Sequence, residues 1–156
     1  MSLGPEAPIS LALRALAHVH GHVGWLAVAA LAHPAIVLRR PERRAHLAVV
    51  SSTALVTLAA AIGASLYPAY RETLRAQVFL DARALGLAFE RKEHLAFGVV
   101  LLAWAGAAAY GAALRAEAPA RVRLRRVAHR AFVASAALAL VAAALGTAVA
   151  VHRSFG

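Results

Sequence analysis

The sequence predicts an all-α integral membrane protein, an antiparallel bundle of four transmembrane helices in one domain over residues 1–156. Three observations lead to this fold class: the composition, the length of the apolar stretches and the clustering of the charges between them. Hydrophobic residues make up 62% of the chain and charged residues only 15%, whereas a soluble domain is about 45–50% apolar. A soluble fold of this size would leave much of that apolar surface in water.

Four apolar stretches cover most of the chain. They run from about residue 9 to 38, from 46 to 66, from 95 to 114 and from 131 to 151. At 1.5 Å of rise per residue, about 20 helical residues cross a hydrocarbon core of roughly 30 Å. Each stretch is therefore expected to form one transmembrane helix.

Arginines gather in the connections at 39–44 and 115–130, which together hold ten basic and two acidic residues. The other side of the predicted membrane has seven basic and five acidic residues. The positive-inside rule places the arginine-rich connections in the cytoplasm and both termini on the non-cytoplasmic side of a bacterial-type inner membrane. The net charge of +10 then belongs to loops that flank the lipid bilayer, so no nucleic-acid partner is expected. The first ten residues lack a positive n-region, and no cleavable signal peptide is expected.

The connection between the second and third stretches, residues 70–93, is too long for a simple turn. Its apolar residues Leu74, Val78, Leu85 and Phe89 have the spacing of one helical face. This pattern predicts a short amphipathic helix at the membrane interface. The alternative is an irregular cap over the end of the bundle.

Eight histidines are the strongest chemical signal in the chain, because ionisable residues within membrane helices commonly mark functional sites. The topology assigns five of them to the outer half and three to the inner half. The outer set is His18, His20, His22, His94 and His152, and the inner set is His33, His46 and His129. The absence of cysteine excludes disulfides, thiolate metal sites and cysteine-attached haem.

His22 and His33 lie eleven residues apart in the first stretch. On a helix this spacing puts them within about 20° of one line and about 16 Å apart along the axis. A helix face with one histidine in each half of the bundle suits two b-type haems, because haem iron accepts imidazole as an axial ligand.

The predicted ligands of the outer haem are His22 and His94, with His18, His20 and His152 as competing partners. The predicted ligands of the inner haem are His33 and His129, with His46 in reserve. In an alternative arrangement His46 pairs with His129, and His33 has another role. Imidazoles that merely contact water or lipid headgroups are the competing interpretation for the histidines near helix ends.

In its four-helix layout and histidine placement, most of the chain resembles the small bis-histidine b-type membrane cytochromes, including the haem-bearing membrane anchors of respiratory enzymes. The resemblance implies two haem b groups and transmembrane electron transfer, with a quinone or a redox protein as the partner. It implies an electron carrier more than a stand-alone enzyme, as a homo-oligomer or as a subunit of a larger complex.

Two other classes of function remain open. A histidine-lined metal or proton transporter would also place imidazoles within a membrane bundle, although one methionine, no cysteine and no deep carboxylate make a poor conduction path. A structural or assembly subunit of a membrane complex could carry the same histidines without using them.

Overall fold

The computed structural model describes residues 11–40 and 43–152, and almost all of these residues are helical. The elements are α1 (Leu11–Val37), α2 (His46–Ala69), the π-helical turn η1 (Tyr70–Leu74), α3 (Arg75–Asp81), α4 (Arg83–Arg115) and α5 (Ala120–His152). By length and composition, four helical runs of the described chain can cross a membrane. The predicted all-α fold and four-helix bundle are confirmed. The expectations for residues 1–10, for Pro41 and Glu42 and for Arg153 lie outside the described residues.

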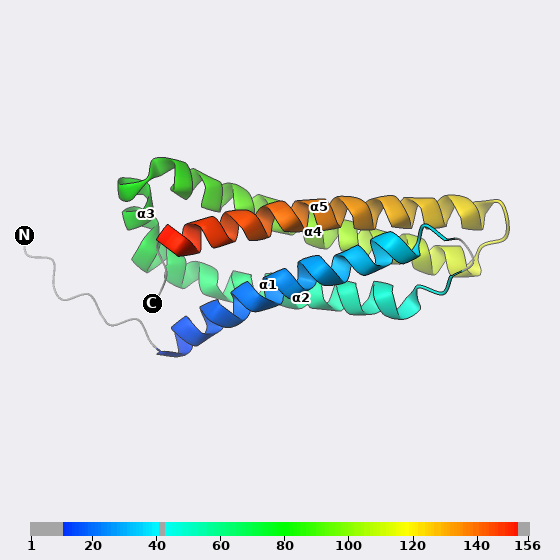
Figure 1. The fold of residues 1–156 in the computed structure, drawn as a ribbon, viewed down its shortest axis with the longest axis horizontal. Helices are drawn as coiled ribbons and strands as arrows, with labels where there is room; N and C mark the ends of the chain where they lie inside the picture. The colour runs from blue at the N-terminus through cyan, green and yellow to red at the C-terminus, as the bar shows by residue number, and fades with distance from the viewer. Residues whose placement is uncertain (1–10, 41–42, 153–156) are drawn as a thin grey trace, which may run out of the picture.

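The four long helices pack in a ring in the order α1, α2, α4, α5, so that α1 and α4 lie across one diagonal. Helices adjacent in the ring run antiparallel (Figure 1). The connections after α1 and after α4 lie at one end, called here the basic end. The start of α1, α3 and the last turn of α5 lie at the opposite end, called here the terminal end.

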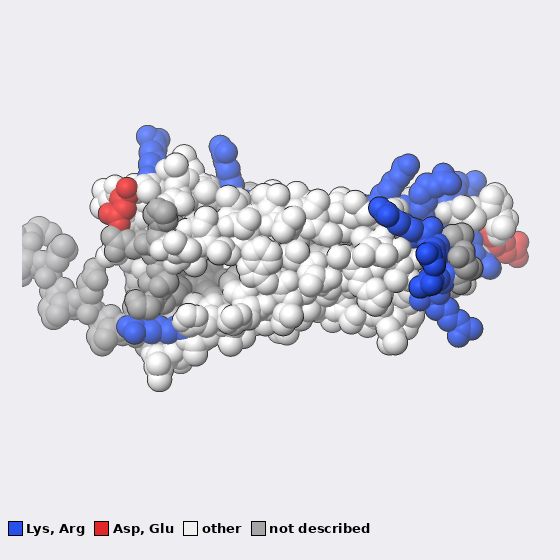
Figure 2. All heavy atoms as spheres, in the orientation of Figure 1, with Lys and Arg blue, Asp and Glu red and all other residues white. Residues whose placement is uncertain are grey.

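The outer surface of the bundle is apolar between its two ends. Leu47, Phe97 and Ile36 are among many large hydrophobic side chains that are more than half exposed. Figure 2 shows Lys and Arg side chains crowded at the basic end and a broad central belt without charged side chains on the face shown. Such a belt is stable in lipid, and the chain is accordingly a multi-pass membrane protein.

Small residues and short polar side chains hold the helices close together. The ring of Phe132 on α5 is fully buried against Gly106 on α4, where an added Cβ would come within 2.9 Å of it. Ser135 donates to the carbonyl of Val99 at 2.8 Å, and Ser52 donates to the carbonyl of Ala30 at 2.9 Å. These contacts join α5 to α4 and α2 to α1, as expected for membrane helices that associate through small residues and hydrogen bonds.

The connection over residues 70–93 is helical, but the four residues of the predicted face are divided among η1, α3 and α4. The helical run of α2 continues through η1 and α3, turns at Ala82 and returns as the first turns of α4. Tyr70 stacks on Phe89 with ring centroids 3.8 Å apart, and Arg75 pairs with Glu90 at 2.6 Å. These two contacts join η1 and α3 to α4 across a helical hairpin.

Arg125 on α5 closes the basic end of the core. Its Nη2 donates to the carbonyls of Arg40 and Arg43 at 3.1 and 2.9 Å, and its guanidinium lies over the ring of Tyr110. The Tyr110 hydroxyl in turn accepts a hydrogen bond from the backbone N–H of Ala45 at 3.0 Å. This network ties α4 and α5 to the connection between α1 and α2.

Candidate functional site

The terminal half of α1 packs loosely on the rest of the bundle. All the buried residues of α1 lie at Ala27 or beyond it, and in Figure 1 the first turns of α1 diverge from the bundle axis. His18, His20 and His22 all lie in this loosely packed half. A group that enters the bundle here displaces fewer packed side chains than it would at the basic end.

His20 faces the interior. It lies seven residues before Ala27, which puts it within about 20° of the buried line of α1, and it is half-buried. Its Nδ1 lies 3.1 Å from the carbonyl oxygen of Ala59 on α2. Because a carbonyl can only accept, Nδ1 is the donor, and in the neutral ring Nε2 keeps its lone pair. A backbone carbonyl that orients an imidazole in this way is the usual support of a metal-bound histidine.

The His20 ring packs against Gly63 on α2, where the absence of a side chain gives it space. A Cβ at Gly63 on α2 would come within 2.8 Å of His20 Cε1, so any larger residue would push the imidazole out of place. Two charged groups of α4 are within electrostatic reach, Lys92 and Glu93. Lys92 is mostly buried, pairs with Glu93 at 3.3 Å and lies over the ring of Phe89.

His22 and His33 share a helix face, as predicted, but that face is turned away from the interior. Leu31 is fully buried, and the two histidines lie about 180° and 200° around the helix from it. Both are exposed, as is His18. Neither His22 nor His33 lies between helices in the described structure, and their ligation of haem stays a prediction.

The two remaining histidines of the terminal half lie on α4 and α5. His94 is exposed, and its Nδ1 donates to the carbonyl of Glu90 in its own helix at 2.9 Å. His152 is the last residue of α5, and its side chain lies outside the described part of the structure.

At the basic end, His46 and His129 lie on different helices. His46 is exposed at the start of α2 and lines a groove between α2 and α4. His129 is half-buried on α5, and its Nδ1 is fully enclosed without a hydrogen-bond partner. The nearby core is filled by Leu31 and Phe132, both fully buried. The ligation of an inner haem by these histidines stays a prediction.

Sequence reasoning included His20 only as a competing ligand and missed its support by Ala59 and Gly63. The sequence does show that His20 lies seven residues before Ala27, and so on the same face of the helix. This spacing indicates an inward-facing His20 only once Ala27 is known to be buried. The pairing of Lys92 with Glu93 was also missed. Among the residues that the structure describes, no three His, Asp or Glu side chains come together as a metal-ion site.

No protein-family model, curated protein or solved structure matches this chain in comparisons with known proteins.

Proposed function

We propose that this protein is a transmembrane electron carrier that holds haem b in the terminal half of its bundle. The observation that supports this most strongly is the geometry of His20. Its imidazole faces inward from a membrane helix, a backbone carbonyl fixes its orientation, and Nε2 has no hydrogen bond to the described residues. Neutral imidazole in a bundle core is the donor that b-type haem requires.

Two features of α1 support a haem in this half of the bundle. The buried residues of α1 all lie at Ala27 or beyond it, so its terminal half can move apart from the other helices, and Gly63 lets the imidazole pack closely on α2. The second axial ligand is assigned to the other histidines of this end, His94 or His152. When bound, haem supplies reversible one-electron chemistry, while the chain supplies ligation, orientation and a low dielectric.

This proposal differs from the prediction made from the sequence in the number of haems and in the histidine that α1 supplies. It commits to one haem, in the half of the bundle where an inward-facing histidine is held by a backbone carbonyl, and the inner haem stays a prediction from the sequence. It also makes His20 the ligand from α1, in place of His22. A quinone or a redox protein remains the proposed electron partner.

The absorption spectrum of the purified protein tests the proposal. A b-type haem with two imidazole ligands gives a sharp α-band after reduction with dithionite, and we expect this band in the reduced-minus-oxidised spectrum. A protein that is folded and helical by circular dichroism but shows no such band would favour the transporter or the structural subunit. Binding of zinc or copper by that colourless protein would separate those two.

The proposed orientation places the basic end in the cytoplasm. Because the chain has no cysteine, single cysteines can be introduced at exposed sites, with Glu117→Cys at the basic end and Arg83→Cys at the terminal end. An impermeant maleimide added to intact cells should label position 83 and should reach position 117 only after lysis. The reverse pattern would invert the topology.

A further inference from the structure

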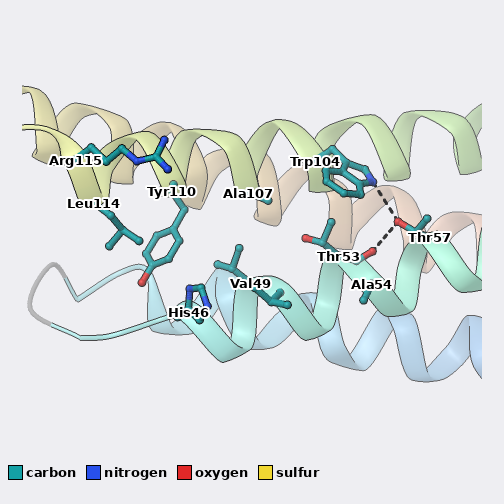
Figure 3. Close-up of a pocket in the computed structure, with 12 residues that line it drawn as sticks. His46, Val49, Thr53, Ala54, Thr57, Trp104, Ala107, Tyr110, Leu114 and Arg115 are labelled. Atoms are coloured by element: carbon teal, nitrogen blue, oxygen red, sulfur yellow. Dashed lines mark hydrogen bonds between the residues drawn. The ribbon is translucent and has the colours of Figure 1, made fainter.

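A lateral groove of about 530 Å³ runs between α2 and α4 in the half of the bundle next to the basic end. These two helices share the smallest of the four neighbouring interfaces in the ring, which leaves the groove open towards the lipid. Figure 3 shows His46 and Arg115 at one end of the groove and Trp104 and Thr57 at the other, with Val49 and Leu114 among the apolar wall residues.

The length of the groove matches one lipid chain. His46 and Thr57 are eleven residues apart on α2, and Arg115 and Trp104 are eleven apart on α4, so each wall is about 16 Å long. One leaflet of a bilayer core is about 15 Å deep, half of roughly 30 Å. A chain in the groove would therefore extend from headgroup depth to the centre of the membrane.

The chemistry of the groove is divided along its length. Its walls are almost entirely apolar, while His46 and Arg115 line the end at headgroup depth. Figure 3 shows the Arg115 side chain lying along α4, with Tyr110 between it and His46. A guanidinium binds a phosphate through paired hydrogen bonds. Basic pockets between transmembrane helices on the cytoplasmic side commonly bind anionic lipid headgroups.

We infer that the groove between α2 and α4 is a binding site for an anionic phospholipid, with its headgroup at the end lined by Arg115 and His46 and one acyl chain along the groove. The occupant is a lipid and not a quinone because the charged group lies at the headgroup end, while the polar groups of Thr57 and Trp104 in the body bond to each other. Thr53 also lines the groove, and its hydroxyl is enclosed by the protein without a hydrogen-bond partner. This hydroxyl provides a means of distinguishing the two ligands.

Tryptophan quenching tests the site in the full chain, because Trp104 lines the groove and the only other tryptophan is Trp25 on α1. The Trp25→Phe protein reports on Trp104 alone, and Trp104→Phe reports on Trp25 alone. Each is reconstituted in phosphatidylcholine vesicles with a minor fraction of phosphatidylglycerol brominated in mid-chain. The comparison vesicles contain the same fraction of brominated phosphatidylcholine.

We expect the brominated anionic lipid to quench Trp104 more strongly than the brominated neutral lipid, and to quench Trp25 no more strongly. In the Trp25→Phe background, Arg115→Gln should weaken the preference of Trp104 for the anionic lipid by about fivefold, the value of one basic residue at an anionic surface. Arg123→Gln removes one charge from an exposed site on α5 outside the groove and should leave the preference unchanged. His46→Gln should act in the same direction as Arg115→Gln.

Two results would overturn the lipid site. Equal quenching of Trp104 by both lipids would show that the groove holds bulk lipid without selection. Relief of the quenching by a short-chain quinone, lost in Thr53→Val and independent of Arg115, would assign the groove to a quinone instead.

Discussion

Replacement of His20 by alanine is expected to lower the haem content of the purified protein by about tenfold or more, a loss typical when a metal site is disrupted. His20 is the histidine of α1 that faces the interior, and its Nδ1 is held by the carbonyl of Ala59. Without the imidazole, a bound haem would lose the ligand that α1 is proposed to supply. Haem per polypeptide and the reduced α-band are the quantities to measure.

His18→Ala and His22→Ala are matched controls, because they remove an exposed imidazole two residues away on the same helix. Both variants should keep full haem content. Exogenous imidazole should restore part of the band in a His20→Gly protein, which a merely structural role of His20 would not allow. Full haem in His20→Ala together with loss in His22→Ala would restore the pairing predicted from the sequence.

Gly63→Ala tests the packing of the His20 ring on α2 without removing the imidazole. The added methyl group would meet His20 Cε1 at 2.8 Å, so the ring must shift away from the Ala59 carbonyl. The expected result is a retained but altered haem spectrum, with a changed midpoint potential. An unaltered spectrum and potential would argue against His20 as the ligand.

The second large effect is expected at the contact between α4 and α5. Gly106→Leu should lower the free energy of unfolding by about 3 kcal/mol, the upper range for overpacking a filled core. An added Cβ there meets Phe132 at 2.9 Å and Ala131 at 3.3 Å, and the phenyl ring is fully buried and cannot move aside into solvent. Denaturation in mixed micelles, followed by circular dichroism, measures the change.

Gly21→Leu on α1 is the matched control, because it makes the same change in a membrane helix at an exposed site where an added Cβ meets nothing within 4 Å. It should leave the free energy of unfolding within about 1 kcal/mol of the parent, the typical range of a substitution away from packed features. Equal destabilisation by both substitutions would mean that loss of a helical glycine, and not the close contact with Phe132, determines stability.

The number of helices could be predicted from the sequence because the length of an apolar stretch is itself the physical requirement for crossing a membrane. The bounds were harder to predict. The third predicted stretch begins at Leu95, whereas α4 begins at Arg83. The charged run that marked the boundary is accommodated within the helix, where Glu90 pairs with Arg75 and Glu93 with Lys92.

The inward face of α1 could not be read from the sequence. In a soluble helix polar residues mark the outer face, but a membrane helix is apolar on all sides. Leu31 is fully buried and Leu26 is more than half exposed, although they are the same residue type. The sequence could establish that His22 and His33 share a line, but not that this line faces outwards while His20 faces inwards.

The sequence indicates that a serine on α2 can bond to a neighbouring helix, but not which serine does so. Serine and threonine hydroxyls in a membrane helix bond to a neighbouring helix or to their own, and residues 51–53 provide three of them. Ser52 does bond to α1, Ser51 bonds within α2, and the Thr53 hydroxyl has no partner. Which of the three reaches across depends on the rotation of α2, which hydropathy does not encode.

The central claim is that this bundle binds haem b through His20, and the most direct measurement is the haem extracted from the purified wild-type protein, identified by mass and divided by the amount of polypeptide. The protein should be expressed in cells with an adequate haem supply, and its helical fold should be verified in the same sample. The account predicts about one protohaem per chain, and the His20→Ala protein purified in parallel should have little. A ratio near two would reinstate the inner haem, and a folded wild-type protein without haem would contradict the account.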